Sequence, residues 1–305
     1  MMIWKSLGLI FKPNSIKSIK SHSWVPTVFK YSHDKARVFF AGRDEMNHSN
    51  IYAFNISLRP PYKILKVSKN PVLSKGSLGF FDDSAVIPSH VIKIRNKFYL
   101  YYIGWTQGVT VPYMSAIGLA ESKSIFGKFK KLKGSPIFGR TSKDPIFVAS
   151  CFVEKKNKSY NMFYTSNTIW KKKRGKLYPK YFIKLASSKN AIDWKFKRNI
   201  MKFRSKAEIA ISRPWVISNY KKKFLFYSFR GKNYKIGFAK IKKDNSLQRM
   251  DREIKITNKI DKFDNKMQEY GSVVKYKNKF FMFYNGNNFG EKGIGLAIID
   301  ENKLI

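Results

Sequence analysis

The sequence predicts an all-β fold, a five-bladed β-propeller with four-stranded blades, on three observations. First, an aromatic strand recurs at spacings of 62, 62, 63 and 57 residues, centred on Phe40, Tyr102, Tyr164, Tyr227 and Tyr284. Second, the repeats alternate apolar and polar residues and are rich in aromatic and β-branched residues, which favours strands over helices. Third, each repeat of about 60 residues has room for four strands, the unit of a propeller blade.

The strands of the repeat follow one order. A short apolar strand comes before each aromatic strand, as in WVPTVFK, VIPSHVIKI, VASCFVE, SRPWVIS and EYGSVVKY. A third strand comes after it, as in SNIYAFN, SAIGLAES, YFIKLASS, YKIGFAK and KGIGLAII. A more polar fourth strand, such as FKKLKGSPIF, follows in the first four repeats. We therefore expect a single domain over 1–305, with blades at about 24–75, 83–138, 144–203, 208–258 and 264–300.

The fifth repeat has no outer strand of its own, and the segment WKSLGLIF at 4–11 is left unassigned. We expect this N-terminal strand to pair beside 294–299 and to close the ring. Closure would remove an open edge strand, which would otherwise invite aggregation.

Composition narrows the function classes. The chain is 43% hydrophobic and 26% charged, as folded globular proteins are, and contains no run of 18 apolar residues that could form a transmembrane helix. Its first residues lack a signal-peptide pattern, so we expect a cytoplasmic protein. The single cysteine, Cys151, excludes an internal disulfide and a cysteine-based zinc cluster. Only four histidines are present, and we expect no metal and no cofactor.

The charge is strongly positive. The 61 Lys and Arg residues against 19 Asp and Glu residues give a net charge of +42, which would attract nucleic acid, an anionic membrane surface or an acidic glycan. The alternative is a drift of composition toward Lys, because the lysines are spread over the whole chain. The basic tract WKKKRGKLYPK at 170–180 falls on the mouth side of the third repeat, where it either draws in an anion or is a solvated loop.

Acidic residues recur at one place in the repeat. Asp82, Asp144 and Asp264 lie 20 residues before their aromatic anchors, and Asp83 and Glu208 lie 19 before theirs. This place comes just ahead of the innermost strand, so we expect a ring of carboxylates at the channel mouth. The alternative is that each Asp caps a turn by accepting backbone N–H groups.

The residues three positions after the anchors reach the same mouth, because the first two strands of a blade run antiparallel. Carboxylates mixed with Trp, Arg and Asn suit a polyhydroxyl ligand. Trp105 is either a sugar-stacking platform or a rim hydrophobe. Arg213, inside an inner strand, needs a substrate or an acidic partner, and a structural Arg–carboxylate pair stays open. The residues expected at the mouth are Arg43, Asp44, Trp105, Asn167, Arg230 and Asn287.

The chain resembles the five-bladed propeller glycosidase-like proteins related to glycoside hydrolase families 32, 43 and 130. The resemblance covers nearly all of the chain and rests on the order of SHSWVPT, FFAGRDEMNHSNI, GSLGFFDDSAVIPS, LYYIGWTQGVTVPY, AEIAISRPWVI, FLFYSFRGKNYKIGFA, MQEYGSVV and FMFYNGNNFGEKGIGLAI.

In such hydrolases an Asp, a second Asp and a Glu from successive blades carry the chemistry. The resemblance implies that Asp83 is the base or nucleophile, that Glu208 facing it is the acid, and that Asp144 orients and tunes that acid. Asp44 is the substitute base, since Arg43-Asp44 matches the first-blade Arg-Asp, and Glu269 is its partner to test. The implied substrate-binding residues are His22, Arg43, Asp82, Trp105, Arg213, Arg230, Asp264, Glu269 and Asn287.

The sequence therefore predicts a glycoside hydrolase-like, carbohydrate-active enzyme that acts on a saccharide, which the charge suggests is anionic. The alternative is a non-catalytic propeller that binds an anionic glycan or nucleic acid. The carboxylate ring favours the enzyme, because a nucleic-acid binder gains nothing from carboxylates at its mouth. The net charge favours the binding protein.

Overall fold

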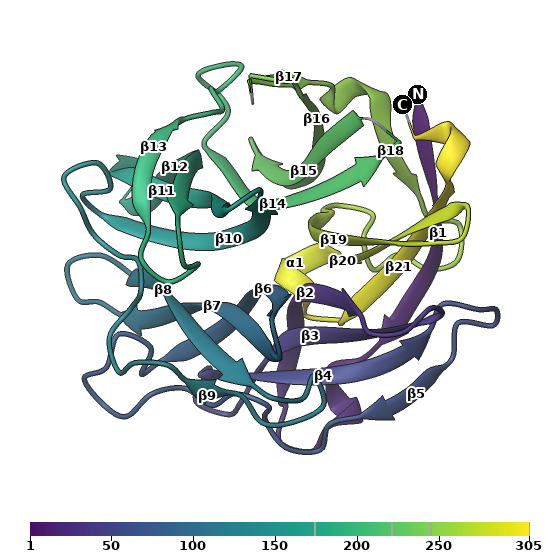
Figure 1. The fold of residues 1–305 in the computed structure, drawn as a ribbon, viewed down its shortest axis with the longest axis horizontal. Helices are drawn as coiled ribbons and strands as arrows, with labels where there is room; N and C mark the ends of the chain where they lie inside the picture. Colours follow the sequence, from purple (N-terminus) through teal and green to yellow (C-terminus); the bar gives the residue numbers. More distant parts are fainter. Residues whose placement is uncertain (174, 221, 245, 305) are drawn as a thin grey trace.

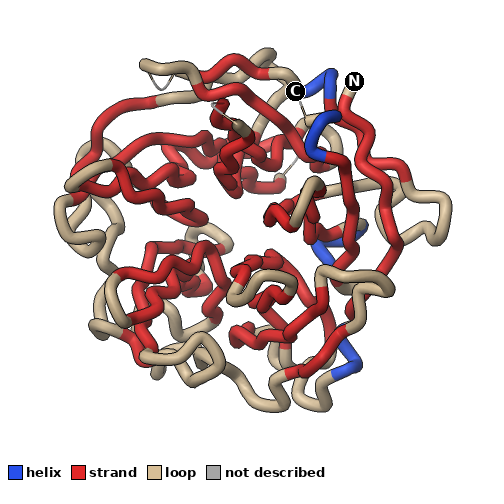
Figure 2. The backbone as a smooth tube through the Cα atoms, turned by 45° about the vertical axis from the view of Figure 1, so that its right-hand side comes forward, coloured by secondary structure: helices blue, strands red, loops and turns tan. Residues whose placement is uncertain are grey.

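Strands make up most of the chain. The computed structural model describes residues 1–305 apart from 174, 221, 245 and 305. Figure 2 shows strand along most of the backbone and helix only in short segments. These are η1 (Pro13–Ser15), η2 (Asp251–Glu253), α1 (Asn287–Gly290) and η3 (Glu301–Lys303). Among the described residues, no helix has the length and hydrophobicity to span a bilayer.

Four successive groups of strands follow the predicted order, and in each group neighbouring strands pair antiparallel. The first group is β2 (Ser21–Lys30), β3 (Lys35–Arg43), β4 (Ser49–Ser57) and β5 (Ile64–Val67). The second is β6 (Ala85–Ile94), β7 (Lys97–Gln107), β8 (Tyr113–Ser122) and β9 (Lys130–Lys131). The third is β10 (Phe147–Lys156), β11 (Ser159–Lys173), β12 (Lys176–Ser188) and β13 (Lys195–Asn199). The fourth is β14 (Ala210–Asn219), β15 (Lys222–Arg230), β16 (Tyr234–Ile241) and β17 (Leu247–Arg249).

A fifth group combines the two ends of the chain. It contains β19 (Glu269–Tyr276), β20 (Lys279–Asn285), β21 (Ile294–Asp300), β1 (Met2–Phe11) and β18 (Ile254–Thr257). The predicted pairing of 4–11 with 294–299 is confirmed, because β1 lies antiparallel to β21 with Lys5 opposite Ile298 and Ser6 opposite Ala297. The expected fourth-repeat boundary at 258 is wrong, since β18 leaves that group and pairs parallel with β1.

The groups stand around a common centre, as the blades of a propeller do (Figure 1). Their inner strands contact one another: β2 touches β6 and β19, β6 touches β10, β10 touches β14, and β14 touches β19. The two termini lie close together at the rim (Figures 1 and 2). Residues from every group therefore reach the centre.

The repeated glycine of the third strand has a packing reason. Gly118 and Gly237 lie opposite the anchor residues Tyr102 and Tyr227 in the ladder. A Cβ at Gly118 would overlap Cζ of Tyr102, and one at Gly237 would overlap Cε2 of Tyr227. The anchor ring thus covers the strand beside it, which explains why glycine and the aromatic residue recur together.

Each inner strand contains a bulge near its middle. The pairing register shifts between Trp24 and Thr27, Pro88 and His90, Val148 and Cys151, Ser212 and Trp215, and Glu269 and Ser272. Within three of these bulges Val25, Arg213 and Tyr270 have φ of 53°, 56° and 57°. Such values are strained for residues other than glycine and concentrate at functional sites, where bulges re-aim side chains.

Candidate functional site

A pocket of about 410 Å³ lies where the inner strands converge. Its size is within the range of small-molecule sites. The bulge residues Val25, Arg213 and Tyr270 all line it, so the strained backbone positions face this space. We call it the central pocket.

Seven aromatic side chains surround the central pocket in an unbroken order, and we call them the aromatic collar. Successive rings lie within 4.6 to 6.5 Å between centroids, except that Tyr181 and Tyr234 meet through their hydroxyl groups. All five groups of strands contribute. In order the collar is Trp24, Trp105, Tyr113, Phe147, Tyr181, Tyr234 and Tyr270, which returns to Trp24.

Three arginines join the collar in lining the pocket. The guanidinium of Arg43 lies 4.9 Å from the ring centroid of Trp24, and that of Arg230 lies 5.4 Å from Tyr234. Burial lowers the pKa of Arg43. The collar therefore holds two cations against its rings by cation–π attraction while their N–H groups remain available to a ligand.

Arg213 forms the floor of the pocket and is 1% exposed. Its guanidinium donates to the carbonyl oxygens of Ser89 and Pro26, the latter at 2.7 Å, and to Oγ1 of Thr27 at 2.8 Å. Burial lowers its pKa to about 9. Within the described chain no carboxylate pairs with Arg213, so neutral oxygens alone solvate this charge. For Arg213 the sequence left an acidic partner open as one alternative. Carbonyl oxygens of the first and second groups bind its guanidinium instead.

The pocket wall is rich in hydrogen-bond donors that have no acceptor. The indole Nε1 atoms of Trp24, Trp105 and Trp170 are buried and unpaired among the described residues, as is Nε of Arg213. An indole can only donate. These four nitrogens are enclosed within the wall and expose almost no surface to the pocket.

Carboxylates are missing from the described lining of the central pocket. The carboxylate of Glu269 lies outside the lining, but Glu269 directly precedes the collar residue Tyr270 and is fully buried. Burial raises the pKa of Glu269 well above its usual range, and Arg230 opposes that shift only in part. Burial therefore favours the protonated form of Glu269.

Three of the five registered carboxylates expected at the mouth are bonded to their own anchor tyrosines instead. The hydroxyl of Tyr102 donates to Asp82 at 3.0 Å, that of Tyr164 to Asp144 at 3.1 Å, and that of Tyr284 to Asp264 at 2.8 Å. All three carboxylates are at most 3% exposed and none lines the central pocket. The 20-residue spacing sets each acid against the hydroxyl of its own repeat, and the predicted roles of these acids stay predictions.

Lysines complete two of these pairs. Lys131 Nζ lies 2.6 Å from Asp82 Oδ2, and Lys184 Nζ lies 3.0 Å from Asp144 Oδ1. The Lys184–Asp144 pair is fully enclosed, with side chains 4% and 0% exposed. Removing either partner of such a buried pair would destabilise the fold. The pair also leaves Asp144 without a free oxygen with which to orient a catalytic acid.

Two further acids and one amide cap turns. Asp44 accepts from the backbone N–H groups of Met46 and His48 at 3.0 and 2.9 Å. Asp83 accepts from the backbone of Gly79 at 3.1 Å. Asn287 binds four loop partners, among them the backbone N–H groups of Lys266 and Met267. The turn-capping alternative stated for the registered acids describes Asp83, and Asp44 and Asn287 make similar loop contacts.

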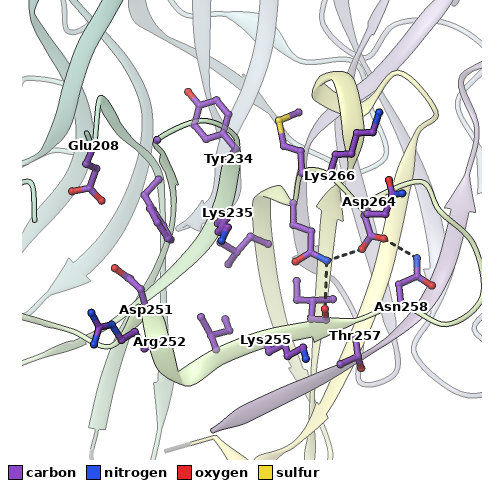
Figure 3. A pocket seen from close by; sticks show the side chains of 18 of the residues that line it. Glu208, Tyr234, Lys235, Asp251, Arg252, Lys255, Thr257, Asn258, Asp264 and Lys266 are labelled. Atoms are coloured by element: carbon purple, nitrogen blue, oxygen red, sulfur yellow. Dashed lines mark hydrogen bonds between the residues drawn. The ribbon is translucent and has the colours of Figure 1, made fainter. Parts of the chain in front are cut away.

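Glu208 is held by arginine outside the central pocket. Arg249 donates to its two oxygens at 2.8 and 2.5 Å and also binds Asp251. Glu208 lines a second cavity of about 1070 Å³, which Figure 3 shows. Asp83 lines neither of these two cavities. The expectation that Asp83 and Glu208 share one pocket is therefore not met, although their catalytic roles stay predictions.

Several predicted residues do reach the central pocket. Arg43, Trp105, Arg213 and Arg230 line it, as expected. His22 lies beside Arg43, 3.4 Å from Nη1 to Nε2. Burial and Arg43 together lower the pKa of His22 to about 4, so this imidazole is neutral at physiological pH.

The basic tract at 170–180 includes the end of β11 and the start of β12. Trp170 and Tyr178 from this tract line the central pocket, while Lys171 and Lys172 are exposed. Arg174 lies outside the described residues. These two strand ends thus present Trp170 and Tyr178 to the pocket, and Lys171 and Lys172 to solvent.

Of the seven collar residues, the sequence predicted only Trp105 at the mouth. Tyr113, Tyr234 and Tyr270 are aromatic residues outside the anchor strands, each at or next to the mouth end of a strand, whereas Tyr181 lies inside β12. Aromatic residues at such strand ends can be predicted to lie at the mouth, because Trp105 already indicates which end of the strands faces it. The serine and proline residues that also line the pocket show no comparable pattern in the sequence.

Relatives of similar sequence match nearly the whole chain. No family model matches the chain. The chain is 28% identical over 301 residues to Uncharacterized protein Rv1502 of Mycobacterium tuberculosis (strain ATCC 25618 / H37Rv), covering 98% of this chain and 100% of the relative. Uncharacterized protein MT1551 of M. tuberculosis (strain CDC 1551 / Oshkosh) shows the same identity and coverage.

Solved structures similar to this one include several glycoside hydrolases. A complex of BT0996 with RGII has a TM-score of 0.75 at 17% identity, and the match covers 96% of this protein and 90% of that one. A thermostable family-43 glycoside hydrolase has a TM-score of 0.68 at 16% identity, with 95% and 92% covered. A structure from the GH130 family of mannoside phosphorylases has 0.68 at 14% identity, with 96% and 89% covered. The chain therefore has an all-β, glycoside hydrolase-like fold.

Proposed function

We propose that the protein binds an acidic saccharide in the central pocket. The observation that carries the proposal is the combination of the aromatic collar with Arg43, Arg213 and Arg230, none of which has a carboxylate partner among the described residues. Cations collected in a largely buried site need a counter-charge, and a ligand can supply it.

A saccharide fits this chemistry better than a simple anion. Aromatic faces offer apolar surface against which a sugar ring packs, while the guanidinium N–H groups of Arg43 and Arg230 donate to its oxygens. The similarity in fold to glycoside hydrolases supports the same ligand class.

We also infer that the strand groups are the five blades of one propeller domain over 1–305, closed by β1. The contacts between successive inner strands, the continuous collar and the pairing of β1 with β21 support this inference.

Hydrolysis of the bound saccharide is the second candidate function, and Glu269 favours it. A general acid must hold a proton when it meets its substrate, and burial raises the pKa of Glu269, which favours the protonated form. The acid precedes Tyr270, whose ring lines the pocket. Asp83 and Glu208, with Asp144, stay the rival catalytic set.

Binding tests the first proposal. Isothermal titration would compare glucuronic, galacturonic and N-acetylneuraminic acids with glucose, galactose and N-acetylmannosamine. We expect at least one acid to bind about tenfold more tightly than its neutral counterpart, and Trp105→Ala and Arg230→Gln each to weaken it about tenfold. Tyr220→Ala and Arg95→Gln are the controls, since both side chains are exposed and outside the pocket. Equal binding of acids and neutral sugars would contradict the proposal.

Activity tests the second candidate. Aryl glycosides of the acid that binds would be screened for release of the phenol by the wild type. Glu269→Gln should then abolish turnover with binding retained, while Asp83→Asn and Glu208→Gln should retain turnover. Loss of turnover in Asp83→Asn, with stability unchanged, would instead support the rival set.

A further inference from the structure

A second cavity adjoins the central pocket at Tyr234, and we call it the lateral cleft. It has a volume of about 1070 Å³ and lies between the β15–β16 hairpin, β17, β18 and the loop 258–268 that leads into β19 (Figure 3). Tyr234 lines both the cleft and the central pocket. The two spaces are therefore neighbours separated by one ring of the aromatic collar.

The carboxylates on the β17 side of the lateral cleft are already satisfied. Glu208 and Asp251 are both bound by Arg249. A carboxylate with a close cation adds little field to the space that it faces.

The carboxylates on the other side of the cleft also have donors. Asp264 accepts from Tyr284 and from Gln268 Nε2, both within 2.9 Å. Asp261 accepts from Nδ2 of Asn258 at 2.7 Å and from the backbone N–H of Leu9 at 2.9 Å. These donors are neutral, so both carboxylates keep their charge, but eight Lys and Arg residues face four Asp and Glu residues in the described lining of the cleft, which is therefore positive on balance.

Apart from Arg204 and Arg249, the cations of the lateral cleft have no such partners. Six exposed basic side chains line it without an ion pair to any described carboxylate: Lys235, Arg252, Lys255, Lys259, Lys262 and Lys266. Figure 3 shows Lys235, Lys255 and Lys266 on different sides of the space. A cleft lined by one sign of free charge concentrates anions.

One side chain crosses the centre where the inner strands meet. Arg213 joins β14 to β2 and β6 through the carbonyl oxygens of Pro26 and Ser89. This link obstructs the path between these strands, which favours a ligand that places one end in the pocket. The units that follow must leave across the collar.

We propose that the ligand is an acidic oligosaccharide whose end lies in the central pocket and whose next units lie along the lateral cleft, passing Tyr234. This inference rests on the proposed function and adds length and direction to its ligand. A saccharide suits the cleft better than a nucleic-acid strand, which needs exposed rings for its bases, whereas the only aromatic side chains described in the cleft lining are Phe229 and Tyr234.

The test uses the acidic sugar that binds best in the titration above, with its dimer, tetramer and hexamer. Affinity should rise about tenfold or more from monomer to tetramer and then level off. The triple variant Lys235→Gln, Lys255→Gln, Lys266→Gln should remove that gain and change monomer affinity less than about twofold. The control triple Lys66→Gln, Lys69→Gln, Lys128→Gln changes the net charge equally at exposed positions outside both cavities.

The outcomes separate the two proposals. Failure of every acidic monomer and oligomer to bind would remove the proposed function and this inference with it. Monomer binding without a gain from length would overturn this inference alone. An equal loss in the control triple would also overturn it, because general charge would then explain the effect. Binding of single-stranded oligothymidylate that the cleft triple abolishes, without a gain from saccharide length, would assign the cleft to nucleic acid.

Discussion

Arg213 donates through Nη2 to Thr27 Oγ1 at 2.8 Å, so that one guanidinium joins the fourth and first groups of strands across 186 positions of sequence. The same nitrogen reaches the carbonyl oxygen of Pro26 at 2.7 Å. The floor of the central pocket is therefore a structural joint as well as a source of positive charge.

Arg213→Met should destabilise the protein strongly. Its acceptors on Pro26, Ser89 and Thr27 would lose their donor while remaining buried, which costs about 2 to 4 kcal/mol in the free energy of unfolding. Arg43→Met, at a half-buried position of the same pocket, should cost less than about 1 kcal/mol. Urea denaturation measures both. Equal stability of Arg213→Met and the wild type would show that the joint does not hold the groups together.

Asp144 should matter for folding more than Asp83 does. Asp144→Asn leaves the enclosed Lys184 ammonium without its counter-charge, which costs about 3 to 5 kcal/mol. Asp83→Asn removes only turn contacts at a partly exposed position and should cost about 1 kcal/mol or less. Thermal unfolding followed by circular dichroism distinguishes them. A smaller loss for Asp144→Asn than for Asp83→Asn would argue against the structural role of the Asp144–Lys184 pair.

Glu269→Gln should stabilise the protein increasingly as pH rises. Because burial raises the pKa of Glu269 in the folded state, its protonated form contributes fully below the unfolded pKa near 4.3, and this contribution is lost as pH rises toward the folded pKa. Glutamine has the shape of the protonated acid and does not titrate. The variant should match the wild type near pH 4 and exceed it at higher pH, with a slope of up to about 1.4 kcal/mol per pH unit. A difference that does not depend on pH would mean that Glu269 is ionised in the fold.

The seam between the two ends of the chain can be tested with neighbouring residues of β1. Trp4 is fully buried and packs edge-on against Phe226 at 5.8 Å, whereas Ile3 is 49% exposed. Trp4→Ala should cost about 3 to 5 kcal/mol in the free energy of unfolding. Ile3→Ala should cost less than about 1 kcal/mol. Similar small losses for both would show that β1 adds little to the seam.

The sequence by itself determined the strand order, because that order is written in local periodicity. Alternation marks each strand, and the aromatic anchor recurs with the glycine that its ring covers, as Tyr102 covers Gly118. The missing outer strand of the last repeat also pointed correctly to 4–11 as the partner of β21. These features depend on neighbours within one repeat or on a simple count of strands.

The tertiary structure decided which repeated residues form the site. The 20-residue spacing of Asp144 and Tyr164 is visible in sequence, but only packing shows that the carboxylate accepts the hydroxyl instead of facing the channel. The aromatic collar brings together residues as distant as Trp24 and Tyr270, and the bulges that aim Arg213 and Tyr270 inward leave no local signature. Periodicity records how a strand pairs, whereas the direction of a side chain at a bulge depends on contacts between distant groups of strands.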